Sequence, residues 1–165
     1  MKTLADRFRK WYEYERDCTA KTLEMLASVP SEKQADALFQ KAIDKFAHVD
    51  AARLRWLHRL GHWPELPSPF PAGLKLEDLP VRFATSEAAW NEYLCKLDDA
   101  EVTKEVEYSF SDGSRYRWTV EGVLTTLFGH AQYHRGQVVT YVSLLGGKAV
   151  DTDYVFFSKP TKLPG

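Results

Sequence analysis

The sequence predicts an all-α fold, a four-helix bundle with one long crossover and one small β-hairpin before the last helix. Four segments carry apolar residues at helical spacing, one segment alternates around an Asp-Gly step, and a proline-rich stretch separates the second helix from the third. With 165 residues, 44% hydrophobic and 27% charged, the chain has the size and composition of one globular domain, which we predict to span residues 1–165.

The first part of the chain predicts two long helices. In residues 3–28 apolar side chains are interleaved with charges at the spacing of an amphipathic helix, and Pro30 ends this helix. Ser31 is a suitable N-cap for a second helix over residues 32–60, which stops before Pro64.

A crossover and a third helix come next. Residues 64–84 contain five of the eight prolines, which favours an irregular connection. Thr85 or Ser86 can cap a third helix that runs to about Leu97.

The last third predicts a hairpin followed by a long helix. Residues 103–119 alternate apolar and polar side chains around a Ser-Asp-Gly turn, a good hairpin signal. A mostly apolar helix over residues 121–145 then ends at Gly146-Gly147.

The charge balance argues against several classes of partner. Twenty-two Lys and Arg stand against 23 Asp and Glu, so we expect no dedicated surface for nucleic acid or for an anionic membrane. We also expect no transmembrane helix, because no apolar run reaches about 18 residues. Cys18 and Cys95 form no CxxC pair and are typical of free thiols in a reducing compartment, so we predict a cytoplasmic protein.

Two histidines of the last helix, His130 and His134, are placed to share a ligand. At this spacing they lie roughly 40° apart around the helix axis and about 6 Å apart along it. Such pairs also occur by chance on helix surfaces, but this helix is mostly apolar, and an unsatisfied buried polar group costs about 1–3 kcal/mol. One divalent metal ion would satisfy both imidazoles. Gln137, almost in line with them, could hydrogen-bond a ligand histidine or line the pocket.

His48 is the natural third ligand, since it lies in the middle of the second predicted helix between apolar residues. On pattern alone, a core histidine bonded to a backbone carbonyl or to Asp44 is an equally good interpretation. His58 and His62 form a competing pair at the end of the same helix. We interpret them as histidines that face water near the helix C-terminus rather than as ligands.

Two segments resemble the DinB/YfiT family of metal-binding bundles. The run GHAQYHRGQVVTYVSLLGGKAVDTDYVFF is similar to the closing segment of that family, in which a histidine precedes a His-His-Arg-Gly-Gln string and an Asp-Thr-Asp. FAHVDAARLRWLHRLGH is similar to its second helix, with a histidine, two small residues and a tryptophan eight positions after the histidine. The likeness covers most of the chain.

This resemblance implies metal ligation by His48, His130 and His134, with zinc or nickel as the expected ion. It also implies a four-helix bundle with a long crossover and an expected homodimer. Tyr133 stands where many members have the first of two adjacent histidines, and Gly129 where many have asparagine. These departures leave the triad intact and concern the pocket wall, and therefore the substrate.

Three neutral imidazoles would leave a divalent ion with an open position, as in catalytic sites. Family members resemble either thiol-dependent transferases and isomerases or hydrolases. We favour a thiol-dependent transferase or isomerase with a small-molecule substrate and a low-molecular-weight thiol, because no acidic residue adjoins the histidine pair as a general base. The alternatives are a hydrolase that uses metal-bound water and a non-catalytic metal-binding or interaction protein.

Five further residues are candidates for the surroundings of the metal. Asp44 could support a ligand, although a surface carboxylate is the more ordinary interpretation. Trp11, Tyr12, Trp56 and Tyr133 could wall an apolar pocket, although aromatic residues at helical spacing are more often core.

Overall fold

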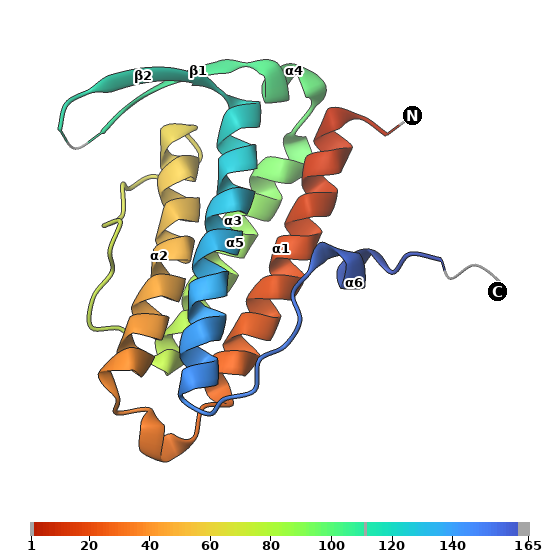
Figure 1. Cartoon of the computed structure of the whole chain (residues 1–165). Coiled ribbons are helices and arrows are strands. Elements are labelled where there is room, and N and C mark those ends of the chain that lie inside the picture. Colours follow the sequence, from red (N-terminus) through yellow and green to blue (C-terminus); the bar gives the residue numbers. More distant parts are fainter. Residues whose placement is uncertain (1, 111, 162–165) are drawn as a thin grey trace.

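The computed structural model describes residues 2–110 and 112–161, and four long helices form its body (Figure 1). Figure 1 shows the first helix running down, the second and third running up and the last running down, so that one long crossover joins the two parallel helices. The predicted fold class, an all-α bundle with a hairpin before the last helix, is confirmed. The four helices are α1 (Leu4–Ala27), α2 (Ala37–Arg59), α3 (Leu79–Lys96) and α5 (Val120–Leu144).

The start of α2 differs from the prediction. Ser31 is not its N-cap but begins a separate 3-10 turn, η1 (Ser31–Lys33). The cap is Asp36, whose carboxylate accepts a hydrogen bond from the Leu38 amide at 2.8 Å. An aspartate here satisfies a free first-turn N–H group, so the helix starts where that acceptor stands.

The third helix begins earlier than predicted. It follows the 3-10 turn η2 (Leu76–Asp78) directly, and Pro80 lies in its first turn. A proline in that place loses no helical hydrogen bond, so it starts a helix instead of breaking one. Thr85 and Ser86 therefore lie inside α3, and the irregular crossover is shorter than residues 64–84.

A short helix and the hairpin cover one end of the bundle (Figure 1). The short helix α4 (Asp99–Thr103) includes the first residue of the predicted hairpin, and strands β1 (Glu105–Ser109) and β2 (Arg115–Thr119) pair antiparallel after it. Ser111 of the predicted turn lies outside the described residues, as do both ends of the predicted domain. The Trp118 ring lies on the backbone of α5 at Gly122, where a Cβ atom would come within 2.3 Å of it.

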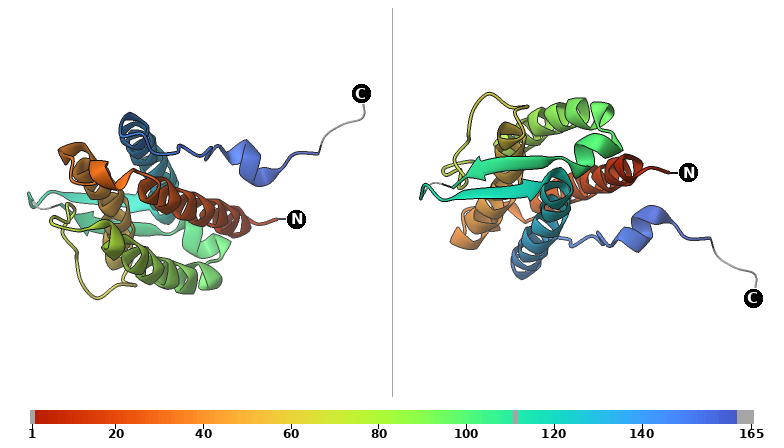
Figure 2. Two further views of the ribbon diagram at one scale, coloured as in Figure 1. Left: turned by 90° about the horizontal axis from the view of Figure 1, so that it is seen from below. Right: turned by 90° about the horizontal axis from the view of Figure 1, so that it is seen from above.

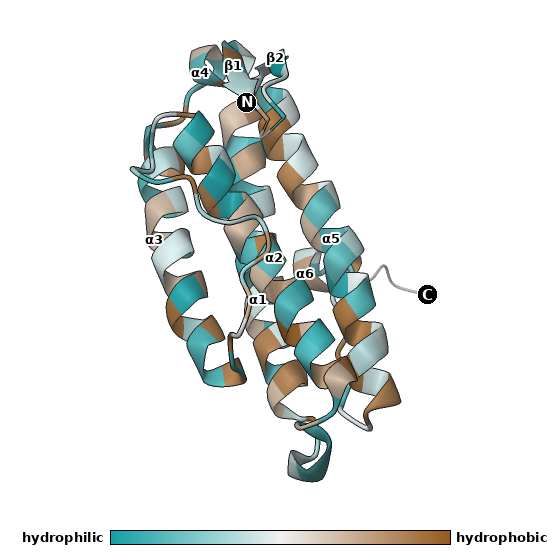
Figure 3. Cartoon of the chain, turned by 90° about the vertical axis from the view of Figure 1, so that its left-hand side faces the viewer, coloured by the Kyte–Doolittle hydropathy of each residue, from teal (hydrophilic) through white to brown (hydrophobic). Residues whose placement is uncertain are grey.

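The core consists of two apolar clusters at different heights of the bundle. One, near the hairpin, includes Phe8 and Trp90, and the other, near the opposite end, includes Met25 and Phe46. Figure 3 shows polar and apolar residues interspersed along the helices that face the viewer, as expected when one face of a helix is buried and the other is not. The histidines of interest lie midway along α2 and α5, which pack more extensively on each other than any other pair of helices in the described chain.

The C-terminal segment leaves the bundle and carries a helix that the sequence did not predict, α6 (Tyr154–Ser158). Figure 2 shows this segment projecting beyond the four helices on the side of α1. The Tyr14 hydroxyl of α1 donates a hydrogen bond to the Thr152 carbonyl at 2.7 Å and so attaches the segment to α1. Within residues 2–110 and 112–161, no helix is both long and apolar enough to cross a membrane.

Candidate metal centre

Packing of α2 against α5 brings His48, His130 and His134 together. The ring centroid of His48 lies 4.9 Å from that of His130 and 4.8 Å from that of His134, and the two α5 rings are 4.5 Å apart. One ring nitrogen from each residue can be chosen so that all three lie within 4.8 Å of one another. Nitrogens on one tetrahedral zinc ion are separated by about 3.4 Å, so small side-chain adjustments would suffice.

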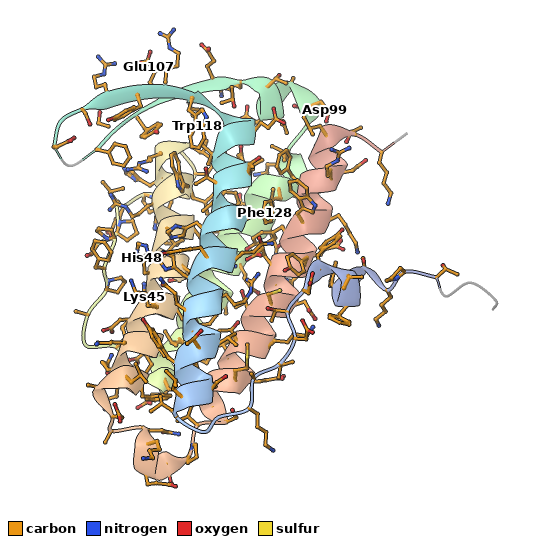
Figure 4. The ribbon with its side chains drawn as sticks, in the orientation of Figure 1. Lys45, His48, Asp99, Glu107, Trp118 and Phe128 are labelled. Atoms are coloured by element: carbon orange, nitrogen blue, oxygen red, sulfur yellow. The ribbon has the colours of Figure 1, made fainter. Side chains whose placement is uncertain are left out.

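The crossover orients His48. Its Nδ1 lies 2.6 Å from the Pro69 carbonyl oxygen. Because a carbonyl can only accept, Nδ1 carries the proton and Nε2 is left with its lone pair. The Phe70 ring stacks on the imidazole with centroids 4.9 Å apart and planes at 14°. Figure 4 labels His48 on the side of α2 along which this segment passes.

The two α5 histidines also have a ring nitrogen that is free to bind. His134 Nδ1 lies 2.9 Å from Gln137 Oε1 and donates to it, which again leaves Nε2 free to bind. His130 Nε2 is buried and has no hydrogen-bond partner in the described part of the chain. A buried, unpaired ring nitrogen beside two others is what a divalent ion would satisfy, so these residues fit a metal.

Burial keeps the two α5 imidazoles neutral. It lowers the pKa of His130 to about 4, and the nearby His134, His48 and Lys45 act in the same direction. Burial also lowers the pKa of His134, again with contributions from His48 and Lys45. Neutral imidazoles are the form that binds metal, so neither residue has to release a proton at pH 7.

The metal-free protein should lose stability as the pH falls from about 6.5 toward 4. Above pH 6.5 His130 is neutral in the folded and in the unfolded chain, so it adds no pH dependence to the unfolding free energy. Below pH 6.5 the unfolded chain binds a proton at this residue, whereas the folded chain binds it only near the folded-state pKa of about 4. In His130→Asn the slope of the unfolding free energy against pH should therefore be smaller. The decrease is at most the contribution of one bound proton per chain. Urea denaturation at several pH values would measure it, and an unchanged slope would contradict the burial of this ring.

Two exposed aromatic rings flank the three histidines. Phe70 is 69% exposed and Tyr133 is 66% exposed. The Tyr133 ring meets His134 edge-on, with centroids 5.0 Å apart. Of the aromatic candidates named from the sequence, Tyr133 is the one that the structure places beside a histidine of the cluster, and it lies at the rim of the site.

The other candidates lie elsewhere. Trp11 packs on Phe8 and Phe128, and Tyr12 is buried beside Trp90. Trp56 lies beneath the hairpin against Tyr108 and Trp118. These ring contacts of Trp11, Tyr12 and Trp56 are therefore made with other aromatic residues and not with the three histidines. The Asp44 carboxylate accepts a hydrogen bond from Gln40 at 2.9 Å, as a surface side chain would.

The competing pair has ordinary partners. His58 Nδ1 lies 3.0 Å from the Trp63 carbonyl oxygen, and the His62 ring packs on Tyr93 with centroids 4.7 Å apart. The two residues thus take part in closing the end of α2.

A buried charged cluster was missed by the sequence reasoning. Glu15 Oε2 lies 3.3 Å from Arg53 Nη2 and 3.3 Å from Arg135 Nη1, and all three residues are at most 5% exposed. Glu15 continues the heptad series of Phe8, Tyr12, Thr19 and others on the buried face of α1. That spacing was a readable sign of a charge inside the core. No pattern in the sequence indicated the contact of the Pro69 carbonyl, because the position of a loop's backbone atoms leaves no sequence pattern.

Comparison with known proteins agrees with the geometry. The model of the DinB family matches residues 1–164, almost the whole chain. Comparisons with curated proteins and with solved structures gave no match. The family match rests on the full length, including both segments that carry the three histidines. The chain therefore belongs to the DinB family.

Proposed function

We propose that this chain is a divalent-metal-dependent enzyme, with His48, His130 and His134 holding one zinc or nickel ion. We further propose that it is a thiol-dependent transferase or isomerase. The observation that carries the metal site is the buried His130 Nε2, which has no hydrogen-bond partner in the described residues although it lies beside two other imidazoles.

The chain's own groups would prepare the site. The Pro69 carbonyl and the Gln137 amide oxygen hold the Nδ1 protons of two ligands, which fixes their tautomers and aims Nε2 inward. Phe70 and Tyr133 flank the cluster and offer an apolar rim to a substrate. A bound divalent ion would supply Lewis acidity, which lowers the pKa of a thiol or of water at an open position.

The surroundings favour a thiol over activated water. In the described chain, the ligand group around the site consists of the three histidines, with no cysteine or carboxylate joining them. Asp44 is bonded to Gln40, and Asp50 is buried with its Oδ2 atom 3.1 Å from Arg82 Nη2. Among the described residues, no carboxylate is grouped with the three histidines as a general base for water, whereas a thiol needs only an open position and a lowered pKa.

Cobalt-loaded protein provides the test. Thiolate coordination adds a strong charge-transfer band in the near ultraviolet, which we expect with glutathione, bacillithiol or mycothiol. The band should be absent in His130→Ala, and the active thiol should then be consumed with an electrophile from a small panel. Unchanged spectra with every thiol, together with coordination closed by a fourth side chain, would contradict the enzymatic proposal. Thiol-independent hydrolysis of esters or amides would instead favour the hydrolase.

The homodimer and the cytoplasmic location stay predictions of the sequence.

A further inference from the structure

Lys45 lies on α2 one turn before His48. Residues three apart on a helix are neighbours on its surface, so the flexible lysine side chain shares the face that carries His48. Figure 4 shows Lys45 just below His48 on the same side of the helix. The side chain is half-buried rather than fully extended into water.

A side chain one turn before His48 lies next to the histidine cluster. Helix α2 packs on α5 more extensively than any other pair of described helices, and the His48 ring lies 4.9 Å and 4.8 Å from the His130 and His134 rings, between centroids. Lys45 is therefore the lysine of α2 next to the site, whereas Lys41, one turn further away, is exposed.

Lys45 has no counter-ion in the described part of the chain. The neighbouring carboxylate, Asp44, is bonded to Gln40, and the other nearby acid, Asp50, is paired with Arg82. No ion pair within 4.0 Å joins Lys45 to a described residue, whereas Lys10 and Lys21 of α1 each have one. A half-buried cation without a partner, beside a site for a dication, gives a positive field that an anion would neutralise.

We propose that Lys45 is the anion-binding residue of this site, and that the ligand taken there is a small thiol with a second, anionic group. The thiol sulfur would take the open position, and the carboxylate, sulfonate or phosphate would lie against Lys45. This inference rests on the proposed function and adds the substrate class to it. Phe70 and Tyr133 are exposed beside the histidines and offer apolar contacts to a short spacer between the two groups.

Three thiols of one length test it on the cobalt-loaded full chain. They are 2-mercaptoethanesulfonate, 2-mercaptoethanol and thiocholine, which carry a negative, a neutral and a positive group. Sulfonate is a poor metal ligand, so its effect reports on the protein charge. Dissociation constants are read from the thiolate charge-transfer band in the wild type, Lys45→Met, Lys45→Arg and Lys41→Met. Each thiol is compared with itself across variants, so differences in thiol acidity cancel.

In Lys45→Met we expect binding of the sulfonate to weaken about fivefold to tenfold, binding of the neutral thiol to stay within about twofold, and binding of thiocholine to strengthen. Lys45→Arg should keep the wild-type order, and so should Lys41→Met. An equal change for all three thiols, or none, would overturn the inference, as would cobalt that is bound but takes up no thiol. Failure of the wild type to bind cobalt would contradict the proposed function itself. Failure of the Lys45 inference and failure of the proposed function are therefore distinguishable.

Discussion

Alanine at His48, His130 and His134 together should abolish binding of divalent metal to this chain. Zinc sites with four ligands bind with about 10–16 kcal/mol, or roughly 2.5–4 kcal/mol for each ligand, so a single alanine should weaken binding about 10²–10³-fold. The measurement is metal content after dialysis, followed by competition with a chelator of known affinity. The loss should be as large at His48 as at the α5 pair, because all three rings meet at the same point.

The matched control uses the other two histidines of the chain. His58→Ala with His62→Ala removes an equal type of side chain from the end of α2, where each ring has a partner of its own. We expect metal binding to be unchanged. One ion per chain retained by the triple variant would refute the assignment. Circular dichroism of each metal-free variant would show that the bundle still forms, so that a loss of metal is not a loss of fold.

Glu15→Gln should destabilise the protein by about 3–5 kcal/mol, which corresponds to roughly 6–20 °C in Tm for a chain of this size. Glu15 is the carboxylate that both Arg53 and Arg135 face, and glutamine would leave two guanidinium groups buried without a counter-charge. The neutral amide has nearly the same shape, so the expected loss is electrostatic rather than a packing defect. Thermal or urea denaturation at pH 7 would measure it.

Glu13→Gln is the surface control. Glu13 lies two residues away on the same helix and pairs with Lys10 at 2.7 Å, but both side chains are more than half exposed. We expect a change within about 0.5 kcal/mol. Replacing the whole cluster, with Glu15→Leu, Arg53→Met and Arg135→Met together, should recover most of the lost stability, since no charge of this cluster then remains buried. A loss in Glu15→Gln no larger than in Glu13→Gln would show that the cluster is solvated.

Local signals were predictable from the sequence. The spacing of His130 and His134 places both on one face of α5, because an α-helix has 3.6 residues per turn whatever it packs against. The Asp-Gly turn and the alternation around it located the hairpin. The misplaced starts of α2 and α3 show the limit of such signals, since Ser31 and Pro80 each suit two different positions at a helix end.

The four long helices and the histidine pair on α5 follow from local patterns in the sequence. The heptad position of Glu15 is a further sequence pattern, which indicates a charge within the core although the sequence analysis did not use it. The groups that complete each site come together only through tertiary packing. His48 joins the pair because α2 packs on α5, and its tautomer depends on a carbonyl that the crossover brings from 21 residues away. Glu15 meets Arg135 across 120 residues. Such contacts depend on the packing of whole helices, and local propensity carries no information about how helices pack.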